Sequence, residues 1–364
     1  MFRLLTLLIT GGILLGGPGL AAAESAMDDA IRAEAETLRR TGHLRDGKPV
    51  QFASRIDQFY DERGYAPAWR AASRVAEARD VIRESYEHGL RPDDYGRGAI
   101  EEWSRWHAGF DIWLSDRVLA LAFDLRYGKT RRDQPDEMAL IEKIAKADSV
   151  ADAMATLVHS TGRYQRLRRA LRQHRRLADS GGWPAIPDGP TIGPDSDDPR
   201  IAVLRKRLAA SGDMAVFDVA IPAYDLALEA AVRRFQKRHG LDIDGLVGKK
   251  TLRALNVPVE QRIDQIRINL ERQRWIDASA TADYILVNVP AFRAYVYLDG
   301  QLRWTTRVIV GEPEDKTPLF QSELNSVIFN PTWSVPYSIA SEEMLPKIQR
   351  DPDYLRRGNY LVFD

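Results

Sequence analysis

The chain has 364 residues, with 52 lysines and arginines, 52 aspartates and glutamates, and no cysteine. The balanced charge leaves no net field to attract nucleic acid or an acidic partner, and the missing cysteine excludes disulfides and thiol chemistry among these residues. The length allows two or three domains, each with a hydrophobic core of its own.

The first 23 residues have the pattern of a secretory signal peptide. Arg3 provides a positive charge, Leu4 to Leu15 form an apolar run, and Ala21-Ala22-Ala23 offers small residues for cleavage. Gly16-Gly17-Pro18-Gly19 is expected to end the signal helix. We expect residues 1–23 to be removed on export; an uncleaved membrane anchor is the alternative, although the run is short for a span. No later stretch is apolar enough to cross a bilayer.

Residues 27–180 are predicted to be all-α, because apolar side chains recur at three- and four-residue spacing. The segment from Trp113 to Phe123 is one such amphipathic helix. Glycine, proline and aspartate then dominate residues 181–198, which are predicted to be a linker.

Residues 199–257 are predicted to form a compact three-helix domain. In each predicted helix, apolar residues recur at three- or four-residue spacing. They are Ile201, Leu204 and Leu208 in the first, Leu228, Val232 and Phe235 in the second, and Leu252 and Leu255 in the third. His239-Gly240 is expected to close the second helix, since glycine commonly follows a helix end. Asp244-Gly245 predicts a tight turn, and Gly248 begins the third helix.

A connecting segment, residues 259–280, is predicted to be helical over Arg262–Trp275 and to lead into a β-rich region, residues 283–364. Alternating apolar residues predict four strands there: Tyr284–Val289, Ala294–Leu298, Leu302–Val310 and Asn325–Asn330. Asp299-Gly300 predicts a two-residue hairpin turn of type I′. Two further elements are predicted, a helix interrupted or restarted at Pro346 (Ser338–Gln349) and a last strand (Tyr360–Asp364).

The segment from Val232 to Thr251 resembles the peptidoglycan-binding domain of many exported cell-wall enzymes. The residues that carry the resemblance form the candidate site of this module: Phe235, Gln236, Asp244, Gly245, Gly248 and Thr251. Phe235 is expected to anchor the core rather than to contact a ligand. Binding to glycan is what the resemblance implies.

Both flanks of this module resemble parts of murein L,D-transpeptidases. The β-rich region resembles the start of their YkuD-type catalytic domain through Val287-Asn288-Val289-Pro290 and the run from Asn330 to Pro336. The N-terminal region resembles the scaffold domain of the large form through Gly64-Tyr65-Ala66-Pro67-Ala68-Trp69 and the run from His88 to Tyr95. The expected fold is therefore multidomain α+β, with an all-α scaffold domain, a three-helix peptidoglycan-binding domain and a mostly-β, incomplete L,D-transpeptidase domain.

In this family the connecting helix packs back on the scaffold domain, so that the binding module is an insertion. Residues 262–276 would form that helix here. A plain interdomain helix is the alternative.

The resemblance implies acyl transfer on peptidoglycan stem peptides. A cysteine thiolate, assisted by a histidine, would attack the third stem residue and release D-alanine, while backbone donors stabilise the oxyanion. The amine of a neighbouring stem would then accept the acyl group and form a 3→3 cross-link, whereas water would give carboxypeptidase action. Peptidoglycan is the implied partner, with envelope proteins as further partners. No cofactor or metal is implied, nucleic acid is not expected, and we expect a periplasmic monomer.

The family's nucleophile lies in a His-Gly-Cys segment that would follow the equivalent of Asp364. We therefore expect the sequence to stop before its active site and the chain as given to be inactive, and we assign no catalytic residue. All the histidines precede the catalytic region and are expected to be surface or capping residues: His43, His88, His107, His159, His174 and His239.

Non-catalytic candidates remain in the β-rich region. Asn330, Trp333 and Pro336 follow the fourth predicted strand and are assigned to the lip of a substrate groove; a Trp333 packed into the core is the alternative. Arg307 and Thr317 are assigned to orienting that groove, although an arginine on a strand face is commonly solvated.

Residues 161–177 form a basic amphipathic helix pattern without an acidic residue. Its arginines are Arg163, Arg166, Arg168, Arg169, Arg172, Arg175 and Arg176. Such a helix fits contact with an anionic membrane or wall polymer, or a solvated face balanced by acids elsewhere in the domain.

Two other classes of protein stay open. One is a non-catalytic peptidoglycan-binding or scaffolding protein of the envelope, and the other is a wall hydrolase with the same binding module. The sequence offers neither the metal ligands nor the paired carboxylates that a hydrolase needs.

Overall fold

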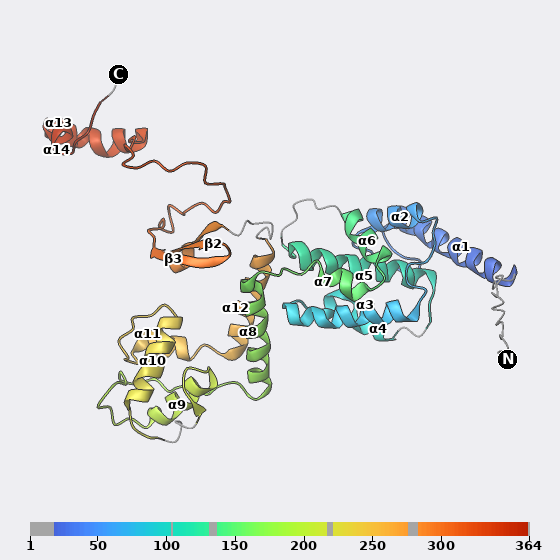
Figure 1. Cartoon of the computed structure of the whole chain (residues 1–364), viewed down its shortest axis with the longest axis horizontal. Helices are drawn as coiled ribbons and strands as arrows, with labels where there is room; N and C mark the ends of the chain where they lie inside the picture. Colours follow the sequence, from blue (N-terminus) through green and yellow to red (C-terminus); the bar gives the residue numbers. More distant parts are fainter. Residues whose placement is uncertain (1–17, 103–104, 131–136, 217–220, 276–282, 363–364) are drawn as a thin grey trace, which may run out of the picture. The chain divides into compact units, whose positions relative to one another are not determined.

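The computed structural model describes residues 18–102, 105–130, 137–216, 221–275 and 283–362. Its contacts divide the chain into two compact units, one of residues 1–284 with 297–301 and the other of residues 285–296 with 302–364. The described residues between 18 and 180 are mostly helical, as predicted for residues 27–180 (Figure 1). Their elements are α1 (Pro18–Thr41), α2 (Ala53–Glu62), α3 (Ala72–Glu84), the 3-10 helices η1 (Ser85–His88) and η2 (Pro92–Tyr95), α4 (Arg97–Glu102), α5 (Ala108–Tyr127), α6 (Glu137–Lys146), α7 (Val150–Ala155) and α8 (Gly162–Asp179).

The expected signal peptide lies mostly in residues 1–17, outside the described part of the chain. The predicted helix break falls at the start of α1, where Pro18 occupies a first-turn position that tolerates proline. The expected cleavage site after Ala23 lies within α1. Among the described residues, no helix combines the length and apolar character that a membrane span requires.

The core of the helical domain forms around α5, which is buried on almost all sides. His107 caps its first turn by accepting a hydrogen bond from the Phe110 backbone N–H. Apolar side chains from α1 to α7 complete one continuous core, which includes Ile31, Ile56, Ile82, Leu119 and Ile144.

A buried carboxylate explains the first N-terminal sequence motif. Asp111 accepts hydrogen bonds from the Tyr60 hydroxyl at 2.6 Å and from the backbone N–H groups of Ala68 and Trp69 at 2.8 and 3.0 Å. The Trp106 indole donates to the same carboxylate at 2.6 Å. Four donors offset the cost of burying this charge, and the loop with Gly64 to Trp69 is held against α5.

The three-helix domain follows the predicted pattern in α9 (Arg200–Ala210), α10 (Leu226–Arg238) and α11 (Lys249–Leu255). Gly240, with φ of 67°, follows the end of α10 in the left-handed conformation that glycine tolerates. The three groups of apolar residues expected to line these helices are all buried in one core.

The segment 181–198 is irregular, as predicted, but part of it belongs to the three-helix domain. Ile186 and Ile192 are buried in the core of that domain, and Ile192 exchanges backbone hydrogen bonds with Val247. The Trp183 indole donates to the Val257 carbonyl at 3.0 Å. Residues 183–192 of the predicted linker therefore pack on the three-helix domain, because isoleucine and tryptophan side chains there gain from burial.

Helix α12 (Val259–Arg274) returns to the helical domain and packs along α8. Its Leu270 is buried with Tyr164 and Leu171 of α8. Tyr164 near the start of α8 meets Arg274 at the end of α12, while Gly182 lies against Val259, so the two helices are antiparallel. The three-helix domain is therefore inserted between two helices that contact each other, as expected from the resemblance.

The second N-terminal motif forms the surface that receives α12. The carbonyl oxygens of His88 and Gly89 accept hydrogen bonds from Arg274 at 2.5 Å and Arg267 at 3.0 Å. Gly89 has φ of 78°, and a Cβ atom there would lie 3.2 Å from the Leu270 side chain. A glycine is therefore required both by the backbone conformation and by the close approach of α12.

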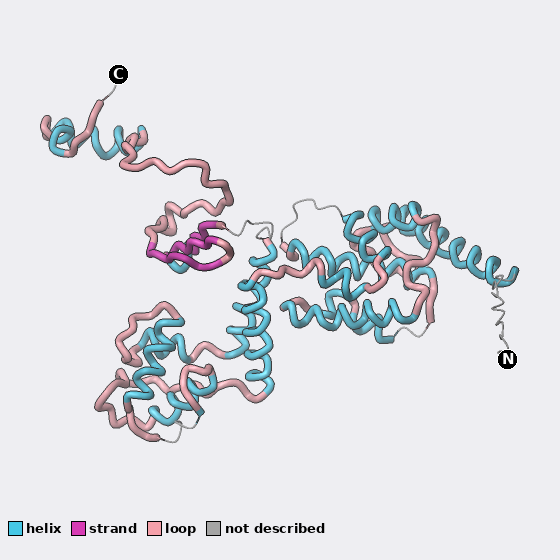
Figure 2. Tube along the Cα trace, in the orientation of Figure 1, coloured by secondary structure: helices cyan, strands magenta, loops and turns pink. Residues whose placement is uncertain are grey.

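The β-rich region begins with a three-stranded antiparallel sheet in the order β1-β2-β3 (Figure 2). Its elements are β1 (Tyr284–Asn288), η4 (Val289–Ala291), β2 (Arg293–Leu298) and β3 (Gln301–Arg307). Asp299 and Gly300 have φ of 52° and 69°, which confirms the predicted type I′ turn.

The remaining strand predictions are wrong. Residues 325–330 and 360–362 contain no strand, and residues 363 and 364 lie outside the described part. Among the described residues, no strand pairs with these two segments, and a strand is stabilised by such pairing. A π-helix (Ile339–Met344) leads into α13 (Leu345–Arg350), which restarts at Pro346 as predicted, and α14 (Tyr354–Arg357) follows.

The buried His88 makes stability depend on pH. Arg274 donates to the Tyr164 hydroxyl at 3.1 Å, and the same hydroxyl shares a hydrogen bond of 3.0 Å with His88 Nδ1. Burial, with Arg168 and Arg274 nearby, lowers the pKa of His88 to about 3. The unfolded chain binds a proton near pH 6.5, so between pH 6.5 and 3 the free energy of unfolding falls as the pH falls.

We predict that His88→Gln, which does not titrate, loses this dependence. Between pH 6.5 and 5 its free energy of unfolding should fall by about 2 kcal/mol less than that of the unchanged chain, measured by urea denaturation of the helical domain. The matched control is His43→Gln, since His43 is exposed. Equal pH dependence in His88→Gln and the unchanged chain would contradict a neutral, buried His88.

Candidate functional site

The residues singled out in the three-helix domain meet in one hydrogen-bond network. Its centre is Gln236, whose side-chain amide nitrogen donates to Asp244 Oδ1 at 2.7 Å, the Leu246 carbonyl at 2.9 Å and Thr251 Oγ1 at 3.3 Å. Its amide oxygen accepts from the Gly245 N–H at 2.9 Å. The network therefore holds the loop between α10 and α11 in a single conformation.

The turn itself is built from Asp244 and Gly245. Asp244 Oδ1 also accepts from the Leu246 N–H at 2.8 Å, and these hydrogen bonds lower the pKa of Asp244. Gly245 has φ of 77°, and a Cβ atom there would lie 3.0 Å from the Glu229 side chain. The Tyr224 hydroxyl donates to the Gly245 carbonyl from the other side. Gly248 then caps α11 with extended backbone.

Most of these residues are unavailable to a ligand. Phe235, Gln236 and Thr251 are 0%, 1% and 5% exposed, and Gly245 is buried as well. Asp244 is exposed, although its Oδ1 is occupied by hydrogen bonds within the loop. Phe235 is a core anchor, as the sequence indicated. The motif therefore shapes the module, and any ligand must be contacted by its exposed neighbours.

This module also contains a buried arginine that the sequence pattern does not predict. Arg207 is 1% exposed and donates from Nε to the Leu255 carbonyl at 2.7 Å. Its guanidinium lies over the Trp183 ring, 3.8 Å from the centroid, and burial lowers its pKa to about 10. Arginine is rarely buried, and the contact with Trp183 joins residues far apart in sequence, so no local pattern could have revealed it.

The candidates in the β-rich region are not assembled into a groove. Asn330, with φ of 51°, and Pro336 are exposed on an irregular segment, and Trp333 is 62% exposed. Neither the predicted strand before them nor the alternative of a Trp333 in the core is present. Arg307 is exposed at the end of β3, as is common for arginine on a strand face.

Thr317 closes a short loop after β3. Its hydroxyl oxygen accepts from the Gly311 N–H at 2.7 Å, and the Asp315 carbonyl approaches Gly311 so closely that no Cβ would fit. The loop is thus locally defined. Within the described residues, no hydrogen bond or ion pair links Thr317 or Arg307 to Asn330, Trp333 or Pro336.

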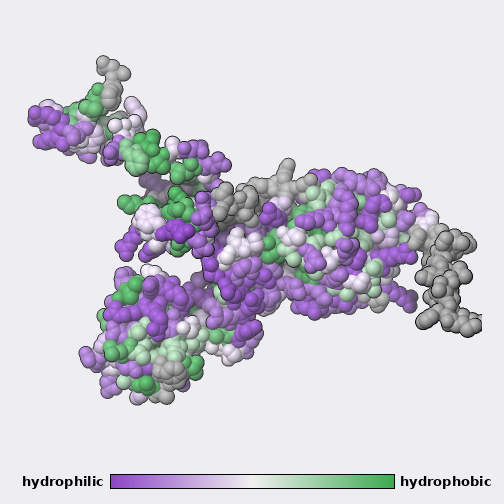
Figure 3. Space-filling model, in the orientation of Figure 1, coloured by the Kyte–Doolittle hydropathy of each residue, from purple (hydrophilic) through white to green (hydrophobic). Residues whose placement is uncertain are grey.

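Apolar side chains are widely exposed in this region, and Figure 3 shows them as green patches. Ile309, Phe320 and Phe329 are among the most exposed. Only Ala294 and Met344 are buried among the described residues of the second unit. Its strands therefore offer surface that other polypeptide would normally cover.

Two histidines differ from the expectation of surface or capping positions. His88 and His159 are 8% and 3% exposed, because each ring packs against Tyr164 inside the helical domain. His107 is a cap, as expected. Across the described ranges, no three histidine, aspartate or glutamate side chains are grouped as metal ligands would be.

Comparison with protein families assigns each region. A "Scaffold domain" model matches residues 54–171, a "Putative peptidoglycan binding domain" model matches residues 197–255, and an "L,D-transpeptidase catalytic domain" model matches residues 282–362. The chain carries scaffold, peptidoglycan-binding and L,D-transpeptidase domains, in that order.

A curated relative agrees with this assignment. The chain is 40% identical over 80 residues to a protein of Haemophilus influenzae named "Putative L,D-transpeptidase". The match covers 22% of this chain and 16% of the relative, so the chain spans about one sixth of the length of the relative it matches.

We predict that Gln236→Ala destabilises the peptidoglycan-binding domain by about 2–3 kcal/mol, because the buried Gly245 N–H and Thr251 hydroxyl lose their partner. Urea denaturation would measure the change. The control is Lys237→Ala at an adjacent, exposed position of α10, expected to cost less than about 0.5 kcal/mol. Equal stability of the two variants would show that the network does not hold the loop.

Proposed function

We propose that these residues are the scaffold, wall-binding and early catalytic-domain portion of a periplasmic L,D-transpeptidase. The enzyme would form 3→3 cross-links between peptidoglycan stem peptides through a cysteine acyl-enzyme. The observation that carries this proposal is the presence of three domain matches in one chain, since each adds a part that the same reaction needs.

The proposed reaction has two steps. A cysteine thiolate adds to the carbonyl carbon of the third stem residue, a C–S bond forms, and the C–N bond to D-alanine breaks as a histidine protonates the leaving amine. The amine of a second stem then forms a new C–N bond while the histidine takes up the proton that this amine loses, and the C–S bond breaks so that the thiolate leaves. Water in place of the amine would make the enzyme a carboxypeptidase. Neither step requires a metal or an organic cofactor.

The thiolate is not among the 364 residues, which contain no cysteine. The proposed division of labour is that these residues bind and position the wall, while the nucleophile comes from a His-Gly-Cys segment beyond them. Arg307, Thr317, Asn330, Trp333 and Pro336 are proposed to border the substrate groove of the complete catalytic domain. Support comes from the exposure of four of them, all but the half-buried Thr317.

The binding module would hold the enzyme on its substrate. Exposed residues around the Gln236 network, such as Asp244, are the proposed contact surface, because the core of the motif is closed. An N-terminal signal peptide would deliver the chain to the periplasm as a monomer that can meet other envelope proteins.

The missing cysteine favours one other candidate, a non-catalytic peptidoglycan-binding scaffold of the envelope. The two proposals differ in the reading frame that follows codon 364. A frame that encodes His-Gly-Cys within about a hundred codons supports the transpeptidase, and a stop codon supports the scaffold.

We predict that the 364-residue polypeptide sediments with purified sacculi but gains no carbapenem adduct in intact-mass spectrometry, because no thiolate is present to be acylated. A module-deleted chain is the binding control. Residues 183–257 can be replaced by a short glycine-rich loop, since Gly182 contacts Val259. Carbapenem labelling would overturn the cysteine mechanism, and equal sedimentation of the deleted chain would overturn wall binding by the module.

A further inference from the structure

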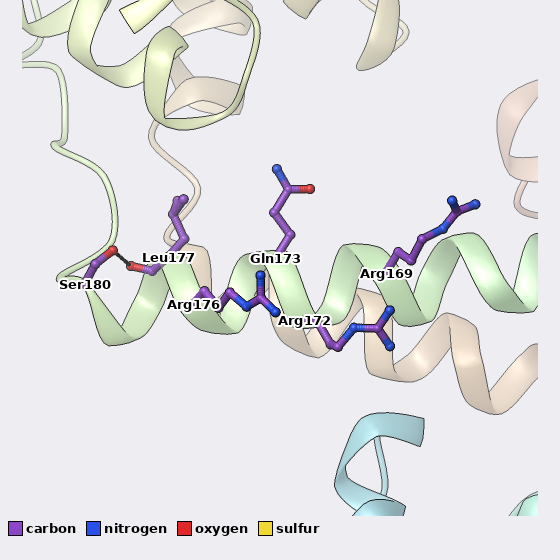
Figure 4. Close-up of a pocket in the computed structure, with 6 residues that line it drawn as sticks. All are labelled: Arg169, Arg172, Gln173, Arg176, Leu177 and Ser180. Carbon is purple, nitrogen blue, oxygen red and sulfur yellow. Dashed lines mark hydrogen bonds between the residues drawn. The ribbon is translucent and has the colours of Figure 1, made fainter.

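A basic hollow lies along α8, outside the candidate sites already described. It has a volume of about 460 Å³, and its lining residues all come from α8 and its C-cap: Arg169, Arg172, Gln173, Arg176, Leu177 and Ser180 (Figure 4). The three arginines recur at i, i+3 and i+7, so their Cα atoms lie about 4.5 and 6 Å apart along the helix axis. Several guanidinium groups thus border one space.

The charge of this hollow is largely uncompensated. Arg169 and Arg176 are exposed, and within the described ranges neither forms an ion pair with a carboxylate. Arg172 has one weak partner, Glu87, at 3.5 Å. Two other arginines of α8 form cation–π contacts within the protein. Arg175 lies over the Tyr86 ring and Arg163 over the Tyr297 ring. Among the described residues, Glu87 is therefore the one acidic residue that pairs with an arginine of the hollow.

The apolar face of α8 is already occupied. Tyr164 and Leu171 are fully buried with Leu270 of α12, and Leu167 packs against the same cluster. A helix that binds a membrane surface must bury its apolar face in lipid, and α8 has no such face to offer. The surface over α8 is accordingly hydrophilic in Figure 3. A polar polyanion fits the hollow better than a bilayer does.

The hollow also lies where the chain leaves α8 and enters the peptidoglycan-binding domain. Leu177 lies in the last turn of α8 and Ser180 is its C-cap, while the Trp183 indole donates to the Val257 carbonyl at the far end of the inserted segment. Peptidoglycan stem peptides carry free carboxylates on acidic residues and at their C-termini. A guanidinium pairs with a carboxylate through directed hydrogen bonds, and several aligned arginines can engage more than one.

We propose that the α8 hollow is a second wall-binding site, which holds the carboxylates of peptidoglycan stem peptides. This inference rests on the proposed wall binding and names a surface for it outside the binding module. The scaffold domain then contributes directly to holding the wall, and its contribution is electrostatic. Binding through the hollow weakens as salt is added, because exposed charges are screened.

The test compares Arg169→Gln/Arg176→Gln with a matched control, Arg40→Gln/Arg91→Gln. The control removes the same charge from exposed arginines of the same domain that form no ion pair among the described residues. Sacculi treated with hydrofluoric acid, which removes phosphodiester-linked polymers, serve as the ligand. At about 50 mM salt the hollow variant should bind about tenfold more weakly than the control, and the difference should shrink at about 500 mM.

A second arm tests the chemistry. Coupling the sacculus carboxylates to glycinamide with a carbodiimide should weaken sacculus binding by the unchanged chain to the level of the hollow variant. Binding by the hollow variant should stay nearly the same. Equal binding of both double variants to untreated sacculi would overturn the inference while leaving wall binding by the module intact. If the unchanged chain does not bind sacculi at all, wall binding itself fails, and the inference with it. The hollow would be assigned to membrane binding instead by a different result. In that result, the hollow variant alone loses binding to phosphatidylglycerol vesicles, while its binding to sacculi is unchanged.

Discussion

The arrangement of the first unit depends on one buried cation, the guanidinium of Arg274. Its side chain is 1% exposed and donates to the His88 carbonyl, the Tyr164 hydroxyl and the Glu271 carboxylate, the last at 3.0 Å. A charge removed from water is tolerated only when such partners surround it, and loss of one partner typically costs about 3–5 kcal/mol. These partners lie on η1, α8 and α12, so the ion holds three segments together.

This junction explains how the chain accommodates an inserted domain. The polypeptide leaves the helical domain at the end of α8 and returns at the start of α12, and the two helices pack along their length. Gly89 leaves room for the Leu270 side chain, and the carbonyls of His88 and Gly89 accept hydrogen bonds from Arg274 and Arg267. The position of α12 on the helical domain is therefore fixed by these polar contacts as well as by apolar burial. The inserted domain keeps a core separate from that of the helical domain.

The features predictable from sequence are the local ones. The Asp299-Gly300 turn, the Gly248 cap and the helical spacing of α9 to α11 are all encoded within a few neighbouring residues, and each is present. Long-range polar contacts were not predictable. Nothing near Asp111 indicates that Tyr60 and Trp69 will donate to it, and nothing near Arg207 indicates that Trp183 will cover it. Candidate residues of the binding module meet in one hydrogen-bond network, but the depth of their burial follows from tertiary packing.

The two units also differ in how far their own residues can stabilise them. The helical and peptidoglycan-binding domains each enclose a continuous apolar core, whereas the second unit buries only Ala294 and Met344 among its described residues. A three-stranded sheet gains stability mainly when one face is covered, and here Ile285, Val287 and Trp304 remain exposed. The hairpin can form because Asp299 and Gly300 favour its turn. The segments after β3 would need apolar contacts to hold fixed positions, and the described residues of this unit make few of them. The regions that match the scaffold and peptidoglycan-binding models therefore carry cores of their own, whereas the region that matches the catalytic-domain model buries little of its apolar surface among the described residues.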